Sequence, residues 1–440
     1  MSGDSKKTII GSGLTGPLLA IMLANRGYTV DLYEKRADLR KADISAGRSI
    51  NLALSHRGIH ALKSANVFNE IEPLLIPMKG RMVHHSDGNL EFQPYSIHSF
   101  EYINSVSRGE LNKILMTVAE KTGNVNIHFK HSLSKVELGT FIFKNGKRIE
   151  AEGEVFGADG AGSVVRQYID SNSDKPSKSE PLGHAYKELS ISADAAGEFK
   201  LEPNALHIWP RGQFMLIGLP NTDRSFTCTL FMPNEGDVSF KSLKTEADVV
   251  DFFNTHFSDA LPLLENFPQS YFENPTGRLA TVYADNWYYK NFYLIGDAAH
   301  AVVPFFGQGM NASFEDCTVL MDYVDSGDDN WLDIFSSYNK MRKSDADAIA
   351  QMAIENYIEM RDSVAQSDYK AKREIANSLS IEFPDRFIPR YNMVSFTSIP
   401  YSEVYKRGKI QQEIISQLME NELDLQKAEK LITEKLSVLS

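Results

Sequence analysis

The chain of 440 residues is 42% hydrophobic and 24% charged, the composition of a globular protein long enough for a large core and two or three domains. Its formal net charge of -12 argues against a binder of nucleic acid or of anionic membranes. Two cysteines, Cys228 and Cys317, are too few for a disulfide framework or a zinc site and favour a reducing cytosol. We find no signal-peptide core and no apolar run of membrane-spanning length, and we expect a soluble chain.

Residues 6–36 alternate between strand and helix patterns. KKTII indicates a strand that ends in glycines, TGPLLAIMLANRG an apolar helix closed by Gly27, and YTVDLYEKR a second strand. This order predicts a βαβ unit and therefore a parallel sheet.

The rest of the chain changes character several times. Helices are expected at 56–71, 107–123 and 248–257, and strands at 71–100 with a hairpin at the Asp-Gly of SDGNL. Further strands run to about 150, a strand, turn and helix cover 154–169, and 183–235 is rich in strand formers. The polar stretch 170–181 is typical of a link between domains. From 331 onward the pattern is mostly helical, and an amphipathic helix at 410–439 is expected to pack on the body of the protein.

The first chemical motif is GSGLTG, with Gly11, Gly13 and Gly16 between the first strand and its helix. Glycines here allow a tight turn and a close approach to a pyrophosphate, which the free N–H groups of the helix N-terminus can bind. Glu34, at the end of the second strand, can accept hydrogen bonds from ribose hydroxyls. The plainer alternative is a glycine-rich turn and a surface glutamate. No second motif of this kind is present, so one dinucleotide with a dedicated fold is expected.

Two further motifs follow. In GADGAGSVVR a strand ends at Asp159. Taken alone, this pattern fits a cofactor-binding motif and an ordinary turn before a helix equally well. In LIGDAAHAVVPFFGQGMN, Asp297 can accept from a ribityl hydroxyl, and the amides of 307–311 can face a negatively charged ring. We interpret His300 in this stretch as structural rather than as a base.

The three motifs, in this order, resemble the FAD-dependent single-component aromatic hydroxylases, whose DG motif is matched by Asp159, Gly160, Ser163 and Arg166. Segments outside them, such as MKGRMVHHSDG, ENYIEM and RFIPRYNMVSF, look like the kynurenine 3-monooxygenases of that family. The resemblance implies an α/β fold with a Rossmann-like FAD-binding domain of the para-hydroxybenzoate hydroxylase type (GR2). It implies FAD-binding segments at 1–70, 96–177 and 283–330, an inserted β-sheet substrate domain at 71–95 and 178–282, and a mainly helical region at 331–440.

The resemblance also assigns residues. It implies that Arg81 and Tyr95 hold a substrate carboxylate, that Asn356 and Tyr391 contact the substrate, and that Phe231 lines its ring. The residues matched to FAD contacts are Gly11, Gly13, Gly16, Glu34, Arg36, Arg108, Asp159, Asp297, Pro304, Gly307, Gly309, Met310 and Asn311. On sequence alone, Arg81 could be a surface arginine and the two tyrosines could be core residues. No catalytic side chain and no metal ligand is expected, because the flavin carries the chemistry.

The implied activity is hydroxylation of L-kynurenine to 3-hydroxykynurenine in tryptophan degradation, with NADPH and O2 as co-substrates and a flavin C4a-hydroperoxide as oxidant. A cytoplasmic location is implied, and a homodimer is compatible with the sequence. Three alternatives stay open: another aromatic substrate, a two-electron FAD reductase, and a same-fold escort of prenylated GTPases without flavin chemistry. Phe306 departs from some bacterial relatives, which carry histidine there.

Overall fold

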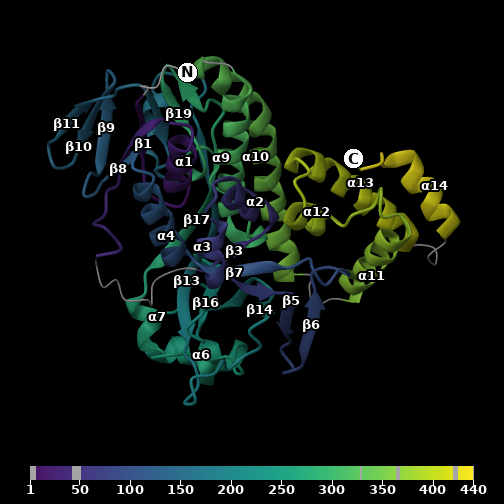
Figure 1. Cartoon of the computed structure of the whole chain (residues 1–440). Helices are drawn as coiled ribbons and strands as arrows, with labels where there is room; N and C mark the ends of the chain where they lie inside the picture. The colour runs from purple at the N-terminus through teal and green to yellow at the C-terminus, as the bar shows by residue number, and fades with distance from the viewer. Residues whose placement is uncertain (1–5, 42–50, 328–329, 363–366, 420–424, 440) are drawn as a thin grey trace. The chain divides into compact units, whose positions relative to one another are not determined.

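The computed structural model describes residues 6–41, 51–327, 330–362, 367–419 and 425–439 (Figure 1). The chain forms two compact units, each assembled from separate segments. Unit 1 comprises Met1–Leu75, Asn104–Leu182 and Leu279–Ala350, and unit 2 comprises Ile76–Ile103, Gly183–Arg278 and Gln351–Ser440. The stretch AGRSINLALSHRGIHAL, residues 46–62, also looks like that family, and its first five residues lie outside the described residues.

Unit 1 is built on a six-stranded sheet of order β18-β19-β12-β1-β2-β8. Its strands are β1 (Lys6–Ile10), β2 (Thr29–Tyr33), β8 (Val125–His128), β12 (Glu154–Gly157), β18 (Tyr288–Tyr289) and β19 (Phe292–Leu294). All neighbouring pairs are parallel except β18 with β19. The predicted βαβ unit is confirmed, because α1 (Thr15–Ala24) connects the parallel strands β1 and β2.

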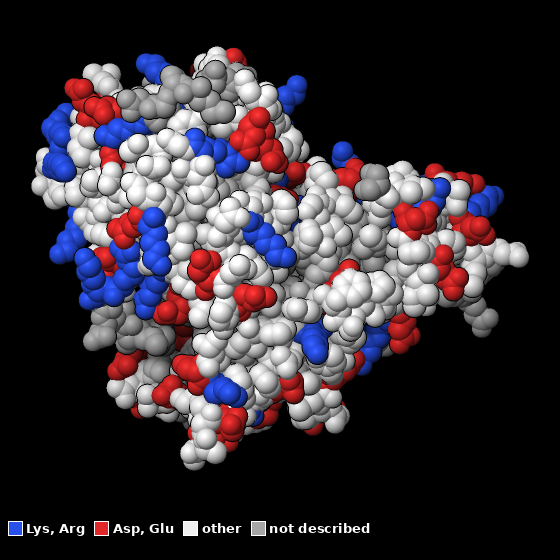
Figure 2. Space-filling view, viewed as in Figure 1, with Lys and Arg blue, Asp and Glu red and all other residues white. Residues whose placement is uncertain are grey.

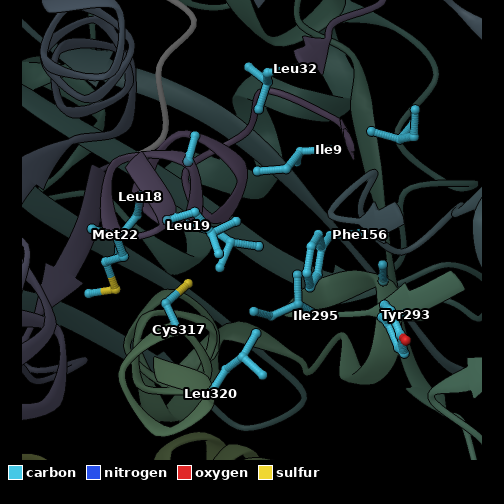
Figure 3. Close-up of a cluster of buried hydrophobic side chains, with 14 of the residues drawn as sticks. Ile9, Leu18, Leu19, Met22, Leu32, Phe156, Tyr293, Ile295, Cys317 and Leu320 are labelled. Carbon is cyan, nitrogen blue, oxygen red and sulfur yellow. The ribbon is translucent and has the colours of Figure 1, made fainter. Parts of the chain in front are cut away.

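The apolar composition of α1 follows from its burial: every residue from Gly16 to Ala24 is buried. Figure 3 shows side chains of α1 lying beside those of α9 (Gly309–Asp325) and of the sheet. The labelled members of this core are Ile9, Leu18, Leu19, Met22, Leu32, Phe156, Tyr293, Ile295, Cys317 and Leu320. Cys317 and Cys228 are both free and buried.

The remaining elements of unit 1 surround this sheet. They are β3 (Asn51–Leu54), α2 (His56–Ser64), α3 (Phe68–Ile71), η2 (Glu72–Leu74), β7 (Ile103–Ser107), α4 (Arg108–Lys121), β9 (Leu133–Glu137), β10 (Thr140–Phe143), β11 (Arg148–Glu150), α5 (Val164–Asp170), α8 (Asp297–His300) and η4 (Pro304–Phe306). The single helix expected at 56–71 is wrong in one respect: it is divided into α2 and α3. Asn66 lies between them with a φ of 59°, a left-handed conformation that an α-helix cannot continue through.

Unit 2 contains most of a seven-stranded sheet of order β17-β13-β16-β15-β14-β5-β6. Its strands are β5 (Gly80–His84), β6 (Leu90–Pro94), β13 (Lys178–Ile191), β14 (Ala205–Arg211), β15 (Phe214–Pro220), β16 (Phe226–Pro233) and β17 (Thr276–Tyr283); β4 (Ile76–Met78) precedes β5. The predicted Asp-Gly hairpin joins β5 to β6. The link expected at 170–181 is partly wrong, because β13 already begins at Lys178 and only the stretch before it is irregular.

Helices cover parts of unit 2. They are α6 (Glu246–His256), η3 (Leu261–Leu263), α7 (Gln269–Glu273), α11 (Ser367–Glu382), α12 (Arg390–Phe396), α13 (Tyr401–Met419) and α14 (Leu425–Lys435), while α10 (Trp331–Asp362) runs from unit 1 into unit 2. A capping box of Thr245 and Asp248 starts α6, whose apolar face joins the core under the sheet. The amphipathic pattern at 410–439 corresponds to parts of α13 and α14 on either side of 420–424, which lie outside the described residues. Five of its apolar side chains are buried in one cluster with Leu379 and Phe387, which agrees with the expected packing: Ile414, Leu418, Ala428, Ile432 and Leu436.

The surface carries both signs of charge. Figure 2 shows Lys and Arg side chains together with Asp and Glu side chains on the face in view. Among the described helices, none combines the length and the apolarity needed to cross a membrane.

Candidate functional site: a dinucleotide cradle and a buried arginine

The glycine motif forms a tight turn between β1 and α1. A Cβ on Gly11 (φ 106°) would lie 2.4 Å from the Ala158 carbonyl oxygen, and one on Gly16 would lie 2.0 Å from the Gly11 carbonyl oxygen. Nothing lies within 4 Å of a Cβ built on Gly13. The N-cap of α1, Leu14, provides no side-chain hydrogen bond, so no cap side chain occupies the N–H groups of the first turn. These are the features of a phosphate-binding turn.

Glu34 lies beside this turn and is paired with Arg36. The Glu34 carboxylate accepts hydrogen bonds from the Ser12 N–H at 2.9 Å and from the Arg36 N–H and Nε at 2.8 Å each. Burial opposes ionisation of Glu34, but the hydrogen bonds and charge of Arg36 outweigh it and lower the pKa. Glu34 is therefore an anion fixed beside the turn, suited to accept from hydroxyl groups.

Three buried polar atoms around the turn have no hydrogen-bond partner within the described residues: Ser12 Oγ, Asn112 Oδ1 and Asp159 Oδ1. Asn112 lies on α4 and donates from Nδ2 to the Ser12 carbonyl oxygen at 3.1 Å. Asp159 uses its other oxygen to accept from the Val164 N–H at 2.7 Å. Buried polar groups are nearly always satisfied, so these atoms fit a polar ligand seated at the turn. Asn112 is not among the residues predicted from the sequence, in which its only signal is its place one helical turn after Arg108.

The GD motif lies at the end of β19. Gly296 has a φ of 61° and is followed by Asp297, which is exposed although the surrounding protein desolvates it and raises its pKa. The charges of His300 and Arg108 counteract that rise, so Arg108 lies near enough to Asp297 to act on it. A carboxylate that is open to solvent yet largely enclosed by protein is the arrangement expected at the floor of a recess. Arg166 of the DG motif braces the same segment by donating to the Ala298 carbonyl oxygen at 2.7 Å.

The segment from Pro304 to Asn311 forms one 3-10 turn and the start of α9. Gly307 has a φ of 66°, and Gln308, the N-cap of α9, makes no side-chain cap, so the N–H groups of the first turn of α9 are left uncapped by a side chain. Pro304 is exposed, and Gly307, Gly309 and Met310 are half-buried.

The Asn311 side chain is committed within the protein. It donates to the Ala53 and Gly307 carbonyl oxygens at 2.8 Å each and accepts from the Ser55 N–H at 2.9 Å. Its amide therefore fastens the loop to β3 and α2, and only its backbone N–H is left for a ligand. Phe305 and Phe306 are both buried.

In unit 2, three of the predicted substrate residues meet. The rings of Tyr95 and Tyr391 stack with centroids 5.0 Å apart, and the Arg81 guanidinium lies 5.7 Å and 5.3 Å from the respective centroids. All three belong to unit 2, on β5, after β6 and on α12. Arg81 is only 8% exposed, which rules out a solvated surface arginine. Burial raises the pKa of Tyr95 well above 10, so its phenol stays neutral and can donate a hydrogen bond.

Phe231 and Asn356 are the two other predicted substrate residues, and both are buried in unit 2. Phe231 lies buried on β16 with its ring 6.2 Å from that of Tyr186. Asn356 is buried on α10 and donates from Nδ2 to the Met360 Sδ at 3.3 Å. Asn356 is thus not the helix-surface residue that its sequence context alone suggests.

Comparison with known proteins shows the family to which the chain belongs. Residues 4–351 match the family model described as FAD binding domain. A kynurenine 3-monooxygenase of Myxococcus xanthus is 45% identical over 98% of this chain and 95% of that protein, and one of Legionella pneumophila is 40% identical over 97% of each. The chain belongs to the kynurenine 3-monooxygenase family. It is an FAD-dependent, NADPH-consuming flavoprotein monooxygenase of the aromatic hydroxylase type.

Solved structures with this fold share little sequence with the chain. The 2-methyl-3-hydroxypyridine-5-carboxylic acid oxygenase has a TM-score of 0.66 at 18% identity, covering 85% of this chain and 93% of that one. A single-residue variant of HpxO from Klebsiella pneumoniae, complexed with FAD, has a TM-score of 0.65 at 14% identity, covering 96% of this chain and 100% of that one. They establish the fold, which is the predicted one.

A buried ionic network contacts the GD motif. It was not predicted from the sequence. Asp316 on α9 accepts from the Gly296 N–H at 3.0 Å, from Arg342 Nε at 3.0 Å and Nη2 at 2.8 Å, and from His300 Nε2. Burial alone would raise the pKa of Asp316, but His300 and Arg342 outweigh it and lower the pKa from 3.8 to about 2. His300 is therefore structural, as interpreted from the sequence, because it is bound to Asp316 and stacked on Trp287.

We expect Asp316→Asn to destabilise the fold by about 3 kcal/mol, since it removes the buried carboxylate that accepts two hydrogen bonds from Arg342 and is paired with His300. A carboxylate whose pKa is lower in the folded state adds stability above its unfolded pKa and loses it as the pH falls through the folded value. Between roughly pH 4 and pH 2, the free energy of unfolding of the wild type should therefore fall by about 2 kcal/mol more than that of the variant. Urea unfolding at several pH values measures both effects. Asp322→Asn, an exposed carboxylate on the same helix, is the control, and equal pH slopes for the variant and wild type would contradict the assignment.

We expect Asn112→Ala to weaken FAD binding roughly 10-fold, because it removes a buried hydrogen-bonding amide beside the dinucleotide turn. Quenching of flavin fluorescence on titration of the apoprotein with FAD gives the dissociation constant. Asn126→Ala, at an exposed position on β8, provides the comparison. FAD affinity equal to that of the wild type would show that Asn112 has only a structural role and does not contact FAD.

Proposed function

We propose that this protein hydroxylates L-kynurenine at the ring carbon ortho to its amine, forming 3-hydroxykynurenine. One O2 and one NADPH are consumed with a proton, and NADP+ and water are released. The observation that carries the proposal is the buried Arg81 under two stacked tyrosines, in a chain whose other unit has the dinucleotide cradle. Arginine binds carboxylates through two parallel hydrogen bonds, and kynurenine carries its carboxylate at the end opposite to the reacting ring.

The substrate residues receive these roles. Arg81 binds the carboxylate, and the neutral Tyr95 and the Tyr391 phenol donate hydrogen bonds to it. Asn356 and Phe231 are proposed to contact the rest of the substrate, with Phe231 against its ring. No side-chain base is needed, because the amine already makes the ring electron-rich.

The cofactor residues hold FAD without reacting. Gly11, Gly13 and Gly16 admit the pyrophosphate, and Glu34 and Arg36 take the adenosine ribose. Arg108, Asp159 and Asp297 take polar groups along the chain of the cofactor. Pro304, Gly307, Gly309, Met310 and the Asn311 N–H seat the ring, where the N-terminus of α9 stabilises negative charge. When bound, FAD supplies the redox chemistry by accepting a hydride from NADPH and activating O2. Phe305 and Phe306 keep water from the loop.

We infer that the protein works in the cytoplasm, since its two cysteines are buried free thiols, and that it is compatible with a homodimer. The decisive assay is kynurenine-stimulated NADPH oxidation with mass identification of the product. A product heavier by one oxygen supports the proposal. NADPH oxidation that yields only peroxide, or hydroxylation of other aromatics alone, would contradict it.

We expect Arg81→Ala to raise the KM for kynurenine roughly 30-fold or more, because a charge-assisted, desolvated interaction with the carboxylate is lost. FAD content should stay at the wild-type level, because the substitution lies in unit 2. Steady-state kinetics and flavin absorbance measure both quantities. Arg224→Gln, a half-exposed arginine paired with Glu198, is the matched control. Unchanged KM in Arg81→Ala would remove Arg81 from the substrate site.

A further inference from the structure

Tyr391 lies on a helix that is too short to be stable without contacts to the rest of the protein. Helix α12 runs only from Arg390 to Phe396, and its N-cap, Pro389, provides no side-chain hydrogen bond. Isolated helices shorter than about 12 residues are marginal in water. The placement of Tyr391 against Tyr95 and Arg81 therefore depends on the contacts made by its neighbours.

One neighbour, Arg390, is held by Glu355. Arg390 donates from Nη1 to Glu355 Oε2 at 2.7 Å, while Glu355 Oε1 accepts from Lys409 Nζ at 2.8 Å and from the Tyr405 hydroxyl at 3.2 Å. Burial opposes the charge on Glu355, but Lys409 and Arg390 outweigh it and lower its pKa. Glu355 thus joins α10, α12 and α13, and it directly precedes the predicted substrate residue Asn356.

Gly408 on α13 leaves room for this arrangement. A Cβ there would lie 2.6 Å from Cδ and 3.1 Å from Cγ of Arg390, so any larger residue must displace the arginine stem. The Arg390 side chain is 13% exposed and that of Glu355 is 20% exposed, so water screens the ion pair less than a surface pair.

The other neighbour, Asn392, is held by Glu101. Asn392 donates from Nδ2 to Glu101 Oε2 at 3.0 Å, and the Ser96 hydroxyl donates to the same oxygen at 2.5 Å. Ser96 directly follows Tyr95. Glu101 therefore connects the residue after one tyrosine of the stack to the residue after the other.

We propose that Glu355 and Glu101 are positioning residues that hold α12 on both sides of Tyr391 and so set the affinity of the Arg81–Tyr95–Tyr391 trio for the amino-acid end of the substrate. Neither carboxylate contacts the substrate in this proposal. The inference rests on the proposed function, in which the trio binds the carboxylate of kynurenine.

The test uses the holoenzyme of Glu355→Gln and Glu101→Gln. Each substitution keeps the side-chain shape but removes the charge, and we expect each to raise the KM for kynurenine about 5- to 20-fold. kcat should change less than about 2-fold, because the reacting end of the substrate is untouched. FAD absorbance and the melting temperature should match those of Glu413→Gln, the control, which removes an exposed carboxylate paired with Lys435 on the same group of helices.

Two further variants separate positioning from general damage. Arg390→Lys keeps the charge that faces Glu355 and should retain most of the kynurenine affinity, whereas Arg390→Gln should lose it. Combining Arg390→Gln with Glu355→Gln should cost little more than either single change, because both remove the same contact.

Several outcomes would overturn the inference. If the wild type turns over kynurenine and both glutamate variants have an unchanged KM, the positioning role is wrong but the proposed function stands. A loss of FAD or of melting temperature in those variants, with no change in KM, assigns the two glutamates to stability and also overturns it. A wild type with no kynurenine-dependent turnover overturns the proposed function and this inference with it.

Discussion

A guanidinium that is 8% exposed, facing the rings of two stacked tyrosines, is the interaction on which the functional account depends. Removing an arginine from water is costly, and contacts within the protein, including those with Tyr95 and Tyr391, offset part of that cost. An anionic ligand offsets more of it, and the planar carboxylate of an amino acid matches the guanidinium in charge and geometry. Glu355 and Glu101 contact α12 on either side of Tyr391, and the proposal that they position this tyrosine depends on the same interaction.

Unit 1 contains the glycine turn, where backbone N–H groups and a few buried oxygens are arranged as a dinucleotide would require. Gly11 and Gly16 allow the chain to approach itself more closely than any side chain would permit. Asp316 then fixes the backbone of Gly296 from behind, with Arg342 and His300 satisfying the rest of its charge. The groups left over are the buried oxygens of Ser12, Asn112 and Asp159, which a bound FAD would meet.

Much of this could be read from the sequence because it depends on local signals. The βαβ unit, the hairpin at Asp87–Gly88 and the acidic residues near three strand ends (Glu34, Asp159 and Asp297) follow from turn residues and strand periodicity. The family resemblance assigned Arg81, Tyr95 and Tyr391, which lie together in the structure. The elements that could not be read depend on contacts distant in sequence. Asp316 meets Gly296 and Arg342 only after folding, and Glu355 meets Arg390 and Lys409 across three helices. The break at Asn66 depends on a left-handed residue that no periodicity reveals.

The central claim is that Arg81 recognises the charge of the substrate carboxylate. Calorimetric titration of the wild-type holoenzyme with L-kynurenine and with its neutral carboxamide tests this directly, because the two ligands share a shape and differ in charge. The account predicts that the carboxamide binds about 10- to 100-fold more weakly, the difference expected for a charge-assisted pair in a desolvated site. Equal affinity for the two ligands would contradict it.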